Sequence, residues 1–183
     1  GVSGFGEVFK SGGRVVKNVS GYDLSKLMTG SFGTLAALTE ITLKVLPRPE
    51  SELTVVARAM GAESALTTMT SIASSAFESS GLAYLPEPAA TRCAAIGKGS
   101  SALVARLEGP AVSLDERARG VEASIQGSAT RLDRESSAAL WREVRDAAWM
   151  PLHGCVWRVS VPPAGAVRAV EANRPDDWAF DWA

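Results

Sequence analysis

The sequence predicts an α+β fold in two parts, and three observations lead to that expectation. With 46% hydrophobic and 21% charged residues, the 183-residue chain has the composition of a globular protein and the length to bury a core. A glycine-rich stretch ends at Pro47 and Pro49, which stop a strand and mark a domain boundary. From residue 50 onward, strand and helix patterns follow one another in the β-α-β-β-α-β order of the ferredoxin-like unit.

The first part is expected to hold three short strands and one short helix. The pattern predicts the strands at Val8–Lys10, Arg14–Lys17 and Leu35–Leu46 and the helix at Tyr22–Met28. Asp23 adds negative charge to the first turn of this helix, and Gly30 follows its end. In the last strand, Ile41, Leu43 and Val45 alternate with polar residues, so one face of the strand is expected to be buried.

The second part is expected to form a compact α+β domain. Its ferredoxin-like unit would consist of strands at Leu53–Ala59, Leu82–Leu85, Ala102–Glu108 and Ala129–Leu132 and helices at Ala62–Phe77 and Leu114–Gln126. Further elements are predicted as a helix at Ser136–Trp149, a strand at Cys155–Val161, a helix at Val167–Ala172 and a strand at Trp178–Trp182. Pro- and Gly-rich residues between the second and third strands are expected to form a loop.

Composition and charge argue against several classes of function. A net charge of −1 provides no electrostatic footprint for nucleic acid or an anionic membrane. No apolar run approaches the ~18 residues of a transmembrane segment. Cys93 and Cys155 lie far apart without metal-site spacing, and few cysteines without a signal peptide favour a reduced, cytoplasmic setting.

Two turn-forming clusters lie on either side of the short predicted helix. Residues 20–23 form the first cluster, and Gly30–Thr34 form the second. Glycine accepts positive φ and lets a backbone approach a ligand closely. The N–H groups from Ser31 to Leu35 could therefore cradle an anion or bind a heterocycle. A tight turn before an ordinary strand is the alternative explanation, because glycine motifs alone are weak signals.

The motifs around these clusters resemble those of a known family. They are Lys17–Val19, Gly21–Leu24, Leu27–Met28, Gly30–Leu35, Thr39–Glu40 and Lys44–Pro49. In this order they resemble the FAD-binding subunit of bacterial glycolate oxidase, within the vanillyl-alcohol-oxidase superfamily of PCMH-type FAD-linked oxidases. A looser likeness at residues 102–109, 140–145, 156–162 and 176–183 extends the resemblance over nearly the whole chain.

This resemblance implies a division into two domains. Residues 1–49 would be the C-terminal part of a PCMH-type FAD-binding domain, and residues 50–183 a ferredoxin-like cap domain. The resemblance further implies that the chain is a fragment. The half of the flavin domain with the pyrophosphate loop would precede Gly1, and the cap would continue beyond Ala183.

By position in the motif, the resemblance also implies a set of residues that bind FAD. They are Gly21, Tyr22, Asp23, Gly30, Ser31, Gly33, Thr34, Leu35 and Leu38. For Asp23, a role in bracing its own turn is an equal alternative to contact with FAD. Two positions depart from the family, in which many members have an acidic residue at Phe32 and a glycine at Ala36.

The activity implied by the resemblance is that of an FAD-dependent 2-hydroxy-acid oxidoreductase complex that turns glycolate into glyoxylate. Its partners would be a catalytic flavoprotein subunit and an iron–sulfur subunit, in the cytoplasm or attached to the inner membrane through the complex. A non-catalytic structural subunit that assembles these partners is the alternative. A stand-alone D-lactate-type dehydrogenase is a third interpretation, less favoured because the cap of that group is usually larger and richer in histidine.

Five other residues are candidates for chemistry. Lys17 and Asn18 would lie near the substrate or the flavin ring, or serve as ordinary strand-end and turn residues. Arg106 and Arg158 suit carboxylate binding, although a structural salt bridge is the commoner role of such residues. His153, the only histidine, is expected to be a loop residue and cannot form a multi-histidine metal site.

Overall fold

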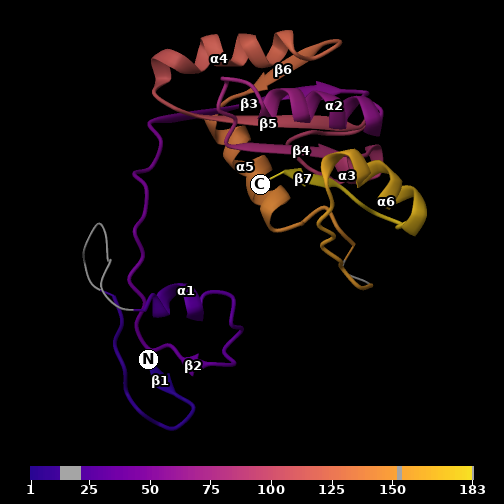
Figure 1. Ribbon diagram of the computed structural model, residues 1–183. Coiled ribbons are helices and arrows are strands. Elements are labelled where there is room, and N and C mark those ends of the chain that lie inside the picture. Colours follow the sequence, from indigo (N-terminus) through magenta and orange to yellow (C-terminus); the bar gives the residue numbers. More distant parts are fainter. Residues whose placement is uncertain (13–21, 152–153, 183) are drawn as a thin grey trace. The chain divides into compact units, whose positions relative to one another are not determined.

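The computed structural model describes residues 1–12, 22–151 and 154–182 of the chain, in two compact units (Figure 1). The units comprise residues 1–47 and 48–183. The first contains β1 (Val2–Ser3), α1 (Leu24–Met28) and β2 (Ala36–Ala37). The assignment of residues 1–49 and 50–183 to a flavin domain and a cap stays a prediction.

The second unit is built on a five-stranded antiparallel sheet with the order β6-β3-β5-β4-β7. Its strands are β3 (Ser51–Arg58), β4 (Gly81–Leu85), β5 (Ala102–Gly109), β6 (Ala129–Leu132) and β7 (Phe180–Trp182). Its helices are α2 (Ala62–Ala73), α3 (Glu87–Arg92), α4 (Ala111–Ala123), α5 (Arg134–Arg145), the 3₁₀ turn η1 (Pro163–Gly165) and α6 (Ala166–Asn173). The α+β class and the ferredoxin-like order β3-α2-β4-β5-α4-β6 predicted from the sequence are confirmed.

Helices cover both faces of this sheet. On one face α2 and α4 pack Met69, Ile72 and other apolar residues against the sheet, and on the other face Leu140 of α5 and the alanines of α3 do the same. Thr54–Ala57 of β3 are therefore buried on both faces. This burial explains why the core of the strand is an apolar run rather than an alternation of apolar and polar residues.

The predicted elements of the first unit are only partly correct. The strand expected at Leu35–Leu46 is reduced to β2, which pairs with β1, and Val8–Lys10 makes no strand beyond an isolated bridge from Val8 to Val2. A strand requires a partner for its backbone N–H and C=O groups, and among the described residues only β1 provides one. The predicted strand at residues 14–17 lies outside the described residues.

Two predictions in the second unit are wrong for physical reasons. Cys155–Val161 forms no strand, because no neighbouring strand pairs with the described part of this segment, and Trp157 is 81% exposed. The loop expected after β4 contains α3, in whose first turn Pro88 is tolerated because N–H groups there need no intrahelical partner. The remaining predicted helices and strands are present with shifted ends, and the strand at 129–132 has its predicted bounds.

Helix α4 packs closely against Phe77, which follows α2 in the chain. At Gly120 of α4, the Phe77 ring leaves no space for a side chain. A Cβ atom at Gly120 would lie 2.2–2.8 Å from ring atoms of Phe77. One turn earlier, Arg117 donates hydrogen bonds to the carbonyls of Phe77 at 2.9 Å, Glu78 at 2.8 Å and Glu108 at 2.9 Å. The guanidinium therefore fixes the backbone that carries the ring facing Gly120.

We expect Gly120→Ala to lower the free energy of unfolding, although alanine is the better helix former. Helix propensity favours alanine by up to about 1 kcal/mol, whereas forcing extra volume into this contact costs about 1–3 kcal/mol. Urea denaturation of the two proteins measures the difference. In a Phe77→Ala background the same substitution should become stabilising. Greater stability of Gly120→Ala in the unsubstituted background would contradict the packing argument.

The two cysteines have opposite environments. Cys93 is fully buried among the apolar residues beneath the sheet, and this burial, together with the nearby Glu143 carboxylate, raises the pKa of its thiol to about 12. Cys155 is exposed. Because the thiolate is the reactive form, the Cys93 thiol is unreactive while the protein is folded.

A colorimetric thiol reagent at about pH 8 is therefore expected to label Cys155 quickly in the folded protein and to label Cys93 only when the protein unfolds. Cys155→Ser should remove the fast phase, and Cys93→Ser should leave it unchanged. The second thiol should appear in the same urea range as loss of structure. Fast labelling of a folded Cys155→Ser variant would show that Cys93 is accessible.

Candidate functional site

The segment between α1 and β2 folds as a tight glycine turn. Gly30 and Gly33 have φ values of 79° and 74°, and Phe32 between them has a φ of 50°. The backbone N–H of Thr34 donates to the carbonyl of Ser31 at 3.0 Å, and the Thr34 hydroxyl donates to the same oxygen at 2.7 Å. In the four-residue turn Ser31–Thr34, the two central residues are Phe32 and Gly33. Positive φ at both of them is typical of a type I′ turn, a conformation that glycine adopts without strain.

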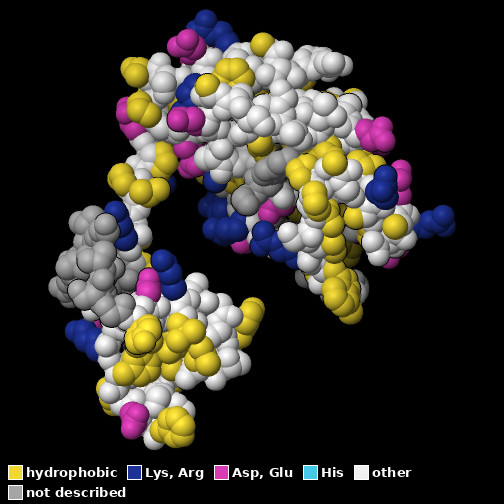
Figure 2. All heavy atoms as spheres, viewed as in Figure 1, with side chains coloured by type: hydrophobic (Ala, Val, Ile, Leu, Met, Phe, Trp, Pro, Cys, Tyr) yellow, Lys and Arg dark blue, Asp and Glu magenta, His cyan; other side chains and the backbone are white. Residues whose placement is uncertain are grey.

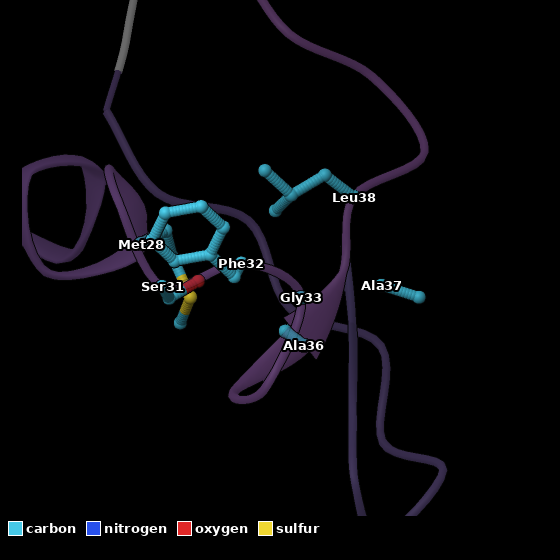
Figure 3. A pocket seen from close by; sticks show the side chains of 7 residues that line it. All are labelled: Met28, Ser31, Phe32, Gly33, Ala36, Ala37 and Leu38. Carbon is cyan, nitrogen blue, oxygen red and sulfur yellow. The ribbon is translucent and has the colours of Figure 1, made fainter. Parts of the chain in front are cut away.

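The turn forms one wall of an open hollow of about 530 Å³ (Figure 3). The hollow is lined by Met28, Ser31, Phe32, Gly33, Ala36, Ala37 and Leu38. In Figure 3 the side chain of Leu38 points toward the ring of Phe32, while Ala37 points away. None of the described hydrogen bonds is donated by the N–H of Phe32 or Gly33. The site thus combines apolar side chains with backbone donors that can serve an anion or a ring carbonyl.

The structure brings only some of the predicted site residues to this hollow. Ser31, Gly33 and Leu38 line it. Gly30, Thr34 and Leu35 belong to the same segment without lining it, Tyr22 is exposed ahead of α1, and Gly21 lies outside the described residues. The sequence did not point to the other lining residues, because they carry no polar side-chain group and are not themselves glycines. They are Met28, Phe32, Ala36 and Ala37.

Asp23 has a structural role at the start of α1. Its carboxylate accepts a hydrogen bond from the N–H of Lys26 at 3.1 Å and lies 3.5 Å from the Lys26 ammonium. This is an N-cap, which satisfies one of the donors left free at a helix start. The bracing role expected for Asp23 is present, and its contact with a cofactor stays a prediction.

The second unit offers no comparable site among the residues that the structure describes. Arg106 donates to Ser80, lies 3.4 Å from the carboxylate of Glu108 and stands 5.0 Å over the ring of Trp141, which is the structural role anticipated as the alternative. No cluster of three or more metal-ligating side chains occurs in the described ranges. Lys17, Asn18 and His153 lie outside those ranges. No described helix has the length and apolar character to cross a membrane.

Comparison with curated proteins shows likeness to glycolate oxidase subunits, to a D-lactate dehydrogenase and to FAD-linked oxidoreductases. The chain is 32% identical to glycolate oxidase subunit GlcE of Escherichia coli over 99% of its own length and 46% of that protein. It is 35% identical to glycolate oxidase subunit GlcD of Bacillus subtilis over 45% of the chain and 18% of that protein. A D-lactate dehydrogenase of Anaerostipes hadrus is 51% identical over 28% of the chain and 11% of that enzyme. No protein-family model matches the chain.

These likenesses agree with the family of FAD-linked oxidases anticipated from the motifs of the chain. Within this family, the likeness that covers almost all of the chain is to a glycolate oxidase subunit. The chain spans less than half the length of that subunit.

Proposed function

We propose that this chain is part of the FAD-binding subunit of a glycolate oxidase complex, an FAD-dependent 2-hydroxy-acid oxidoreductase that converts glycolate to glyoxylate. The observation that carries the proposal is the 32% identity to GlcE over 99% of the chain. The other likenesses, to GlcD and to a D-lactate dehydrogenase, support the same class of chemistry. Residues 1–49 would then be part of the flavin domain and residues 50–183 its ferredoxin-like cap.

The residues around the hollow fit FAD in character. The N–H groups of Phe32 and Gly33 provide donors for a phosphate or a ring carbonyl, and Met28 and Leu38 provide apolar contact for a planar ring. FAD, when bound, accepts the hydride from the hydroxy acid. The share of this chain is to hold and orient one part of the cofactor, through Ser31, Gly33, Leu38 and the neighbouring predicted residues.

We also propose the assembly implied by this function. The partners would be a catalytic flavoprotein subunit and an iron–sulfur subunit, and the complex would act in the cytoplasm or at the inner membrane. A structural, non-catalytic subunit is the second candidate. It is favoured by the second unit, where Arg106, a candidate there for binding a carboxylate substrate, is engaged in structural contacts.

The protein as encoded by its gene is expected to carry FAD. Flavin absorbance of the purified subunit, measured alone and in the complex, checks this expectation. If the subunit oxidises the substrate itself, adding glycolate without oxygen should bleach the flavin absorbance of the subunit. Bound flavin that glycolate does not bleach in the isolated subunit would favour the structural alternative. A subunit without flavin in both states would refute the proposal.

Gly33→Val is expected to remove most of the bound flavin and leave the second unit folded. A valine held at the positive φ of Gly33 is strained by about 1–3 kcal/mol, so the turn would rearrange. Gly4→Val is the matched control, since Gly4 lies in the same unit without positive φ and with no atom within 4 Å of a built Cβ. Flavin-to-protein absorbance ratios of the two variants give the comparison. Equal ratios in both would show that the turn does not hold the cofactor.

A further inference from the structure

Phe32 occupies a position that its own turn does not favour. It is the first central residue of the Ser31–Thr34 turn and has a φ of 50°. Type I′ turns prefer Asn, Asp or Gly here, because an ordinary side chain meets the backbone when φ is positive. The local backbone therefore does not explain a phenylalanine at this point of the chain.

Packing within the first unit does not explain it either. The Phe32 side chain is 98% exposed, although an aromatic ring normally contributes by removing apolar area from water. A residue that is both strained and unburied is stabilised by nothing that the described part of the unit provides. Phe5 and Tyr22 are nearly as exposed, but among the described non-glycine residues of the first unit only Phe32 also has a positive φ.

The position of the ring indicates the kind of partner. Phe32 lines the hollow together with Met28 and Leu38, and the Leu38 side chain points toward the ring (Figure 3). The N–H groups of Phe32 and Gly33 lie in the same turn without a described acceptor. A ligand with a polar edge at these donors and a flat aromatic body would place that body against Phe32, Met28 and Leu38.

We propose that Phe32 is a binding residue for FAD whose ring packs against a planar ring system of the cofactor. This inference rests on the proposed function, because FAD is the occupant that function supplies. FAD has two planar systems, the isoalloxazine and the adenine, and both share the chemistry that the site offers.

The test is the dissociation constant of FAD for the flavin-depleted protein as encoded by its gene. Phe32→Leu keeps an apolar side chain at the same positive φ and removes the ring, and it should raise the dissociation constant about five-fold. Phe32→Asn should weaken binding at least as much while leaving the thermal midpoint of the FAD-free protein unchanged or higher, because asparagine tolerates positive φ. The matched control is Phe5→Leu, since Phe5 is 95% exposed in the same unit and does not line the hollow.

Two further titrations identify which ring system is involved. Weaker binding of FMN to Phe32→Leu assigns the isoalloxazine, and weaker binding of ADP assigns the adenine. Unchanged FAD affinity in both Phe32 variants, or an equal loss in Phe5→Leu, would overturn the inference and leave the proposed function intact. A lower thermal midpoint with unchanged affinity would show that Phe32 packs against protein instead. Failure of the unsubstituted protein to bind FAD would overturn the proposed function as well.

Discussion

The pairing of β3 with β5 along the whole length of both strands is the interaction on which the second unit depends. The register runs without interruption from Ser51 opposite Gly109 to Arg58 opposite Ala102. β6 pairs with the other edge of β3 at Thr54–Ala57, so the backbone of β3 is engaged on both sides over these residues. Segments with an equally strand-like pattern, at 38–46 and 155–161, remain without a described partner and form no strand. Backbone pairing, rather than side-chain alternation, decides which segments become strands.

This constraint explains what could be predicted from the sequence. Long amphipathic helices and the buried β3, β4 and β5 were predictable, since their patterns report burial against the sheet directly. The docking of α5 was not predictable. It depends on a chain of hydrogen bonds that joins Trp141 Nε1 to Thr54 Oγ1 at 2.8 Å, Thr54 Oγ1 to Ser137 Oγ at 2.7 Å and Ser137 Oγ to Glu52 at 2.7 Å. These partners are more than eighty residues apart in the chain, so no local pattern reveals them.

In the candidate site, too, some features could be predicted from the sequence and others could not. The turn at Gly30–Thr34 was predictable because glycine spacing reports a local backbone conformation, and Gly33 has the positive φ that such a turn requires. The apolar lining was not predictable, because Met28 and Ala36 are ordinary residues until the chain folds back on itself. For Asp23 the sequence left capping and cofactor contact as equal alternatives; the structure shows its carboxylate capping α1, and contact with FAD stays a prediction.

The two units are stabilised by different forces, and this difference bears on function. Burial against a sheet stabilises the second unit, whereas none of the described residues of the first unit is buried. Figure 2 shows hydrophobic side chains gathered on the surface of the first unit, and Ile41, Leu43 and Val45 are among its exposed residues. The glycine turn is therefore held by local hydrogen bonds to Ser31 and Met28 rather than by a core beneath it. A loop of this kind gains rigidity from whatever occupies it, so ligand binding and local order in the first unit are expected to be thermodynamically coupled.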